Sequence, residues 1–211
     1  MYIEQTGNLF ADFRVISKKS DLQMILKRYS LFGSMKKILT LVLGCLLFTA
    51  DFATAQNTVA HSAITFKIKN LGITVDGSVT GLQATIHFNP GDMVSASIEA
   101  TVDTKTISTD NSMRDGHIRS DEFFDAAKYP KILLKSISIK HKSGNKYVGQ
   151  FNLTIKNKTK TVEIPFTYTA KGTLSDFNGS FRINRLDYGV GDSSLTLSNE
   201  VAISIDAEFR D

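Results

Sequence analysis

From residue 56 onward the chain alternates apolar and polar side chains with a period of two, and this alternation limits what it can fold into. Val94, Ala96, Ile98, Ala100 and Val102, for example, are each separated by one polar residue. Side chains of a β-strand point alternately to its two faces, so the pattern gives each strand one apolar face. No run of helical period is long enough to cover a sheet. The sequence therefore predicts an all-β fold.

The alternation divides into eight predicted strands. They cover residues 64–69, 73–89, 94–104, 131–140, 147–156, 160–171, 173–184 and 198–210. The second is counted as one long strand bent near Gly77 or Gly81, and a change of register in the fourth predicts a bulge near Lys135-Ser136. Short connections rich in Pro, Gly and Asn favour antiparallel neighbours. Such strands form either a sandwich or a closed barrel.

Small residues occupy several positions on the predicted apolar faces, where a filled core would use Val, Leu or Ile. They are Ala84, Ala96, Ala100, Gly149, Gly179 and Ala207. An eight-stranded barrel is the size that can either pack solid or hold one small ligand, and the small residues favour a cavity. The alternative is a solid core in which the many Phe side chains fill these gaps.

The segment before residue 56 has the features of a leader. Met35-Lys36-Lys37, the apolar run Ile38–Phe48 and Ala53-Thr54-Ala55 match a secretory signal peptide with cleavage after Ala55. The run of about eleven apolar residues is shorter than the roughly 20 that a membrane-spanning helix needs. We expect residues 1–34 to lie upstream of the native start, and residues 56–211 to form a periplasmic or secreted domain.

The cysteine and the charges are unevenly divided between leader and domain. Cys45 is the only cysteine, so the mature domain would fold without disulfides; lipoprotein processing at Cys45 is an alternative to cleavage after Ala55. Residues 1–55 hold seven Lys and Arg against four Asp and Glu, whereas residues 56–211 hold 18 against 17. The domain is nearly neutral, which argues against a nucleic-acid partner.

One stretch of the domain, Arg114–Pro130, departs from the alternation and is interpreted as a short helical excursion between the third and fourth strands. Several blocks within it and after it stand out: Arg114-Asp115-Gly116-His117, Asp121-Glu122-Phe123-Phe124-Asp125, Lys128-Tyr129-Pro130, Leu153-Thr154-Ile155, Thr159-Lys160-Thr161-Val162 and Asn184–Gly191. In their order and spacing, these blocks resemble the YceI-like family of exported lipid-binding proteins. The resemblance runs from about His61 to Phe209, nearly the whole mature domain.

This resemblance implies an eight-stranded, lipocalin-like antiparallel barrel whose interior binds a long-chain isoprenoid or fatty-acid-like lipid. Asn70 stands where the family usually has His, and Asn157-Lys158 replaces its usual Gly-Val turn; neither change alters the apolar register. Inward-facing side chains would then contact the lipid, with two polar residues available to its head group. The predicted contact residues are Phe66, Ile68, Ile86, Phe88, Ile98, Ala100, Val102, Phe151, Leu153, Ile164, Phe166, Tyr168, Phe181, Ile183, Ile203, Ile205, Arg114 and His117.

The polar cluster at the start of the excursion admits two interpretations. In an enzyme acting on an isoprenoid or acyl substrate, His117 would be a base oriented by Asp115, although no nucleophile motif such as G-x-S-x-G accompanies it. In a structural role, Arg114 would bond a carboxylate within a short capped helix and pin the excursion across the barrel. The candidate carboxylates are Asp125 and Asp187, and the candidate cap is Asp110. The structural role is favoured, and we expect a binding protein.

The sequence gives no support for a metal or a cofactor. The histidines at positions 61, 87, 117 and 141 show no H-x-H or H-E-x-x-H pairing. Asp121, Glu122 and Asp125 lack the spacing of a calcium loop. We therefore expect no cofactor and no transmembrane anchor in the mature domain. A secreted interaction barrel with a solid core is a third functional alternative, and the oligomeric state stays open, with a homodimer among the options.

Overall fold

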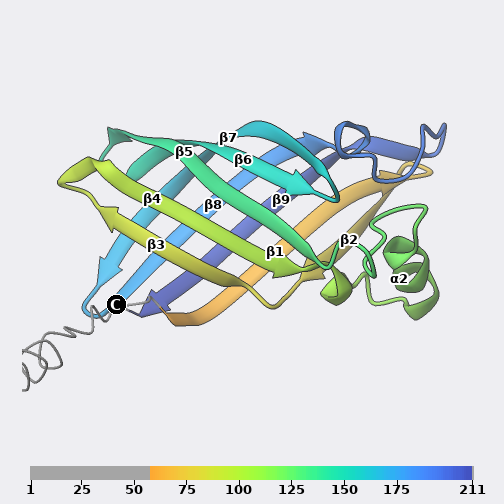
Figure 1. Ribbon diagram of the computed structural model, residues 1–211, viewed down its shortest axis with the longest axis horizontal. Coiled ribbons are helices and arrows are strands. Elements are labelled where there is room, and N and C mark those ends of the chain that lie inside the picture. Colours follow the sequence, from red (N-terminus) through yellow and green to blue (C-terminus); the bar gives the residue numbers. More distant parts are fainter. Residues whose placement is uncertain (1–57, 211) are drawn as a thin grey trace, which may run out of the picture. The chain divides into compact units, whose positions relative to one another are not determined.

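Nine antiparallel strands form one curled sheet in the computed structural model, which describes residues 58–210 (Figure 1). The predicted leader and the segment upstream of it lie outside the described residues. The strands are β1 (Thr58–Asn70), β2 (Ile73–Val79), β3 (Gln83–Asn89), β4 (Asp92–Asp103), β5 (Lys131–Ser143), β6 (Lys146–Ile155), β7 (Lys158–Lys171), β8 (Leu174–Asn184) and β9 (Leu197–Arg210).

The order of the strands in the sheet is β2-β1-β9-β8-β7-β6-β5-β4-β3, so the two edge strands are consecutive in the chain. Only residues 80–82 separate them, and Gly81 supplies the left-handed backbone (φ 75°) that the bend requires. The one long strand predicted over Ile73–Asn89 is therefore two strands that pair with opposite edges. Counted as one, they give the eight positions of the predicted lipocalin-like barrel, and the bend lies at the predicted Gly81.

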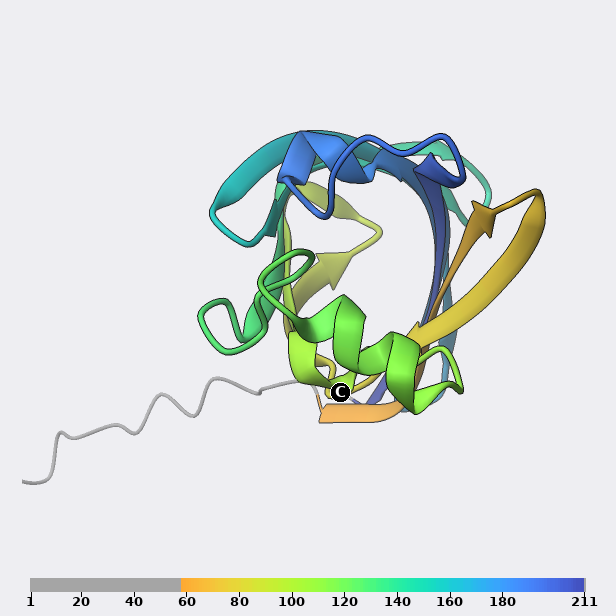
Figure 2. The ribbon, with the colours of Figure 1, turned by 90° about the vertical axis from the view of Figure 1, so that its right-hand side faces the viewer.

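The excursion is longer than predicted, since it fills the whole connection between β4 and β5 (residues 104–130), and it completes one end of the barrel. It contains the 3-10 helix η2 (Thr104–Thr106) and the α-helix α2 (Ser112–Arg119), which lie together at that end (Figure 2). Ser108 exchanges two backbone hydrogen bonds with Ser78 of β2, at 2.8 and 3.0 Å. Because β2 pairs with β1 along its other edge, the excursion satisfies part of the edge that β3 does not cover.

The predicted bulge in β5 is present. The register between β5 and β6 shifts between Ser136 and Ser138, which leaves Ile137 as the extra residue. The Ser136 hydroxyl accepts a hydrogen bond of 2.9 Å from the backbone amide of Ile98 on β4. The bulge explains why the inward-facing positions of β5 change register along the strand.

Gly149 on β6 shows how closely one side of the barrel is packed. A Cβ atom at this position would lie 2.2 Å from a ring carbon of Phe151, whose side chain is buried. The ring of Phe151 therefore occupies the space that a side chain at position 149 would take. In contrast, a Cβ atom at Gly116 on α2 would have no atom of the described residues within 4 Å, apart from its chain neighbours and the backbone of its own helix.

Gly149→Ala should accordingly destabilise the fold by about 1–3 kcal/mol, because the buried ring of Phe151 has to move. Gly116→Ala is the matched control, since it adds the same methyl group in open space on a helix. It should stabilise by roughly 0.5–1 kcal/mol. Urea unfolding of the two variants beside the parent measures both changes. Equal stability of Gly149→Ala and the parent would show that the ring swings aside freely.

Candidate functional site

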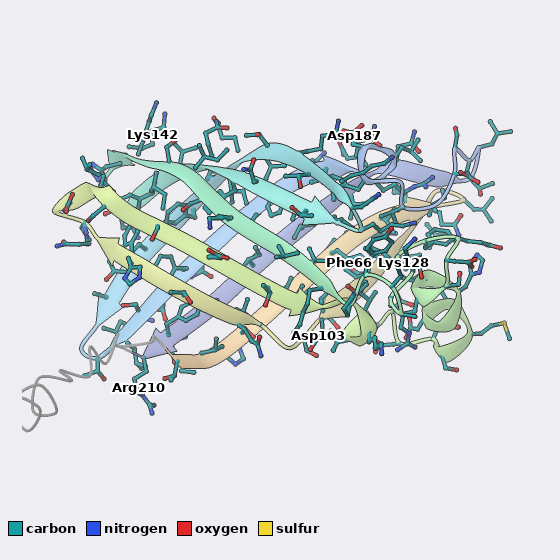
Figure 3. All side chains as sticks on the ribbon, viewed as in Figure 1. Phe66, Asp103, Lys128, Lys142, Asp187 and Arg210 are labelled. Carbon is teal, nitrogen blue, oxygen red and sulfur yellow. The ribbon has the colours of Figure 1, made fainter. Side chains whose placement is uncertain are left out.

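The barrel encloses an apolar cavity of about 370 Å³, to which all nine strands and the excursion contribute side chains. This volume lies within the range of about 300–1,000 Å³ that is usual for small-molecule sites. Inner-face residues such as Phe66, Ile203 and Ile205 are only half-buried, because they face the cavity. Figure 3 shows Phe66 near the end of the barrel that carries α2. The predicted cavity is thus present, and the solid-core alternative does not describe this barrel.

The small residues account for part of this space. Ala84, Ala100, Gly179 and Ala207 line the cavity. Ala96 instead packs against the core cluster around Ile139 and Tyr147. Gly149 leaves no room, because the ring of Phe151 fills it. Four of the six small positions therefore behave as the sequence predicted.

An aromatic cluster closes the end of the barrel opposite α2. It consists of Phe88, Tyr147, Phe166, Tyr168 and Phe177. The ring of Phe88 lies in its centre, with ring centroids 4.7 Å from Tyr168, 5.0 Å from Tyr147 and 5.4 Å from Phe177. Edge-on and tilted contacts of this kind are the preferred arrangements of aromatic pairs. The cavity ends at this cluster.

Sixteen of the predicted contact residues line the cavity, whereas Phe88 and Tyr168 do not and pack within the aromatic cluster instead. The two have the inward register, but they lie at the closed end. The sixteen are Phe66, Ile68, Ile86, Ile98, Ala100, Val102, Phe151, Leu153, Ile164, Phe166, Phe181, Ile183, Ile203, Ile205, Arg114 and His117.

The basic side chains that line the cavity are gathered at the end formed by the excursion and the β8–β9 connection, which we call the mouth. They are Arg114 and His117 on α2 and Arg185, the first residue after β8. Among the described residues no Asp or Glu lines the cavity. The mouth therefore presents hydrogen-bond donors and positive charge above an apolar interior.

Arg114 does not bond Asp125 or Asp187, and that prediction is wrong. Its Nε donates to the hydroxyl of Thr109 and its Nη2 to the Thr109 carbonyl, both at 2.7 Å. Thr109 lies only five residues before Arg114, so its hydroxyl and carbonyl are close to the guanidinium. Asp187 is exposed on the 3-10 helix η3 (Arg185–Tyr188), away from α2 (Figure 3).

The cap of α2 also differs from the prediction. Asn111 is the N-cap, with extended backbone (φ −144°), and its side chain accepts a hydrogen bond of 3.0 Å from the amide of Arg114. Asp110 has left-handed backbone (φ 57°) and precedes the cap. The chain turns at Asp110, which leaves the next residue with the geometry that capping requires.

Asp115 and His117 do not form the pair that a catalytic base would need. Asp115 is buried and accepts hydrogen bonds from the amide (2.8 Å) and hydroxyl of Thr109 and from the hydroxyl of Ser108 (3.2 Å). His117 is exposed, and its Nε2 lies 3.4 Å from a carboxylate oxygen of Glu122. The buried carboxylate holds the excursion to its own preceding loop, so the geometry gives His117 no orienting partner in Asp115.

Arg185 is a residue of the site that the sequence reasoning did not single out. It is buried, and its Nε, Nη1 and Nη2 donate to the carbonyls of Ser198 (3.0 Å), Val190 (2.8 Å) and Asp192 (2.7 Å). Burial lowers the pKa of its guanidinium, an effect that the charge of Asp192 partly offsets. In the sequence, the one indication that Arg185 matters is its position in the block Asn184–Gly191, which is part of the family resemblance.

Gly191 locks the two sides of the mouth together. Its amide donates to the carbonyl of Glu122 at 3.1 Å. A Cβ atom here would lie 2.7 Å from the ring of Phe123 and 3.0 Å from Nη1 of Arg185, and the backbone is left-handed (φ 64°). Phe123 also packs edge-on to His117, with ring centroids 5.0 Å apart. A continuous set of contacts thus connects α2 to Arg185.

Residues 56–209 match the YceI-like domain family. The chain belongs to this family. A UPF0312 protein of Yersinia pestis is 28% identical over 185 residues, which cover 82% of this chain and 96% of the relative. The structure of Burkholderia cenocepacia BcnA superposes with a TM-score of 0.67 at 26% identity, covering 70% of this chain and 95% of BcnA. A polyisoprenoid binding domain from Saccharophagus degradans shares the fold, with a TM-score of 0.60 at 13% identity and coverage of 74% and 97%.

Residues 58–210 contain no helix long and apolar enough to cross a membrane. The same residues contain no group of three or more His, Cys, Asp or Glu side chains that could hold a metal ion.

Asp115→Asn should flatten the loss of stability of the YceI-like domain in acid. Hydrogen bonds, first of all that from the Thr109 hydroxyl, hold the pKa of Asp115 below its usual range. Its carboxylate therefore stabilises the fold above the unfolded-state pKa of about 3.9, and this contribution is lost as the pH falls through the lowered folded-state pKa.

Urea unfolding of the parent and of Asp115→Asn at a series of pH values below about 5 measures this difference. Thr109→Val, which removes the hydroxyl donor and keeps the amide, should fall between the two. Parallel curves for the parent and Asp115→Asn would contradict the assigned role of Asp115.

Proposed function

We propose that this YceI-like domain binds a long-chain apolar lipid, a polyisoprenoid or a similar molecule, in the interior of the barrel. The observation that carries the proposal is the apolar cavity, closed by aromatic rings at one end and bordered by Arg114, His117 and Arg185 at the other. The fold shared with the polyisoprenoid binding domain from Saccharophagus degradans supports the same class of ligand.

The chemistry of the lining favours an apolar chain with one polar end. Each buried CH₂ group contributes about 0.8 kcal/mol of gross transfer free energy, whereas a polar group buried without a partner costs about 1–3 kcal/mol. The walls of the cavity offer almost no partners away from the mouth. A ligand therefore fits with its chain among the apolar walls and its polar end near the three basic side chains.

The enzyme alternative has less support. His117 and Asp115 point to different partners, and the apolar walls do not bring a second polar group to His117 from the depth of the cavity. An organic extract of the purified protein, assayed beside turnover of prenyl and acyl esters, separates the two functions. Stoichiometric lipid without turnover supports binding, and turnover abolished by His117→Ala would support the enzyme.

Ala100→Trp should reduce retention of long lipids while the protein stays folded. Ala100 lines the cavity from β4, so an indole there would block the space between the mouth and the closed end. Long lipids should be rejected first and short ones last. The control is Glu99→Trp, because Glu99 is the exposed neighbour on the outer face of the same strand.

Mass spectrometry of the extracted lipid beside thermal unfolding of both variants provides the measurement. Retention of the full-length lipid by Ala100→Trp would show that the ligand lies elsewhere. Strong destabilisation, beyond the about 1–3 kcal/mol that overpacking costs, would show that the cavity cannot accept added volume at this position.

We also propose that the protein is exported and that its mature N-terminus is Gln56. The support is the sequence of basic residues, apolar run and Ala53-Thr54-Ala55 before the domain. The intact mass of the protein from the periplasm or medium should correspond to residues 56–211. A mass that fits a chain beginning at a lipid-modified Cys45 would replace this proposal with lipoprotein processing.

A further inference from the structure

Four large apolar side chains are exposed around the mouth of the cavity. Leu71 and Ile73 at the β1–β2 turn are 73% and 70% exposed, Met113 on α2 is 86% exposed, and Leu195 in the β8–β9 connection is fully exposed. We call these four residues the apolar rim. Figure 2 views the barrel from this end and shows the three segments that carry the rim around its opening.

The contacts of these segments place the rim at the cavity. Ile73 lies on the same face of β2 as Val75, which lines the cavity two residues further on. The amide of Leu71 donates to the carbonyl of Thr196 at 2.9 Å, so the turn adjoins the segment of Leu195. Met113 lies four residues before His117, and residues at this spacing share one face of a helix. The rim continues the lining of the cavity outward.

Leu71 is an unusual residue for its position. Leu71 and Gly72 have φ values of 53° and 79°, the two positive angles of the tight hairpin turn that normally holds Asn-Gly. A Leu side chain disfavours this conformation, and exposing it to water gives no return in stability. An exposed, strained apolar residue at the opening of a binding site indicates a functional contact.

We propose that the apolar rim inserts into the surface of a lipid bilayer, and that the ligand passes between bilayer and cavity there. This inference rests on the proposed lipid-binding function. A long apolar lipid is held in membranes rather than in water, so an apolar path from the bilayer to the cavity lowers the cost of its transfer. The rim supplies apolar side chains on three sides of the mouth for that path.

A bilayer fits the rim better than a protein partner does. The four side chains come from three separate segments and project individually, which suits insertion among mobile lipids more than a shape-matched interface. The domain from residue 56 onward is nearly neutral, with 18 basic and 17 acidic residues. Apolar insertion rather than attraction to anionic lipids should therefore drive the contact, which makes it only weakly dependent on salt.

The test measures the rate at which the parent protein and two double variants take up a fluorescent polyprenol from phosphatidylcholine vesicles. Leu71→Asn with Leu195→Ser removes half of the rim, and Asn also suits the backbone at position 71. Val94→Asn with Ile137→Ser is the control, because these exposed residues lie on β4 and β5 away from the mouth. Affinity for the same polyprenol delivered from cyclodextrin is measured in parallel.

The rim variant should take up the polyprenol from vesicles about tenfold more slowly, which corresponds to about 1.4 kcal/mol. Its affinity for the cyclodextrin-delivered polyprenol should equal that of the parent, and the control variant should match the parent in both assays. Equal slowing of both variants, an unchanged rate in the rim variant, or a parent that loads only from cyclodextrin would overturn the proposal; the last result would favour a protein donor. Failure of the parent to bind from either source would instead remove the proposed function.

Discussion

The closure of the sheet is the constraint on which the rest of this structure depends. Because β2 and β3 are consecutive and occupy opposite edges, the chain itself joins the two edges of the sheet. The nine strands then surround one interior, and the side chains on their inner faces all point into it. With Ala84, Ala100, Gly179 and Ala207 among the inner residues, the walls do not fill that space. The cavity follows from the number of strands and the size of a few side chains.

The two edge strands β2 and β3 do not pair with each other, so strand pairing does not close the barrel completely. The polar residues of the site lie at the mouth, where the connecting segments complete the wall. Asp115 is surrounded by donors from Thr109 and Ser108, and Arg185 by backbone carbonyls of the β8–β9 connection and of β9. These two charges do not pair with each other. Each charged group is stabilised by hydrogen bonds to nearby backbone and hydroxyl groups. These hydrogen bonds hold the two connecting segments in defined conformations although the segments are not part of the sheet, and so they determine the shape of the mouth.

The regular part of the fold was predictable from the sequence because the side chains of a strand point to only two faces, inward or outward. The alternation predicted the strands, the bulge in β5 and an inner face with space in it. It could not say how far along the barrel an inward residue lies, so Phe88 and Tyr168 were assigned to the cavity although they belong to the closed end. Period and register describe direction across a sheet and carry no information on depth.

The partners of Arg114 and the importance of Arg185 were less accessible, for a related reason. In the excursion the left-handed residue Asp110 redirects the chain just before α2 and so affects which acceptor Arg114 meets. For Arg185 every partner with a short hydrogen bond is a backbone carbonyl, and carbonyls are present in every sequence. A pair of oppositely charged side chains can be suspected from the sequence, because both residue types are visible there. An arginine bound by backbone carbonyls has no partner residue type that the sequence could reveal.

The two ends of the cavity together impose a direction on any occupant. The aromatic cluster around Phe88 seals the depth of the barrel, and the basic residues and the apolar rim lie at the mouth. The proposed lipid, entering at the mouth, would advance with its apolar end first, because burying a polar head among the inner walls would leave it without partners. In the proposed complex the head then stops beside Arg114 and His117, which are exposed, whereas Arg185 is buried and donates to backbone carbonyls. Under the proposed function, the distance from this stop to the aromatic cluster sets the length of chain that fits, which assigns selectivity for length to the closed end and recognition of the head to the opening.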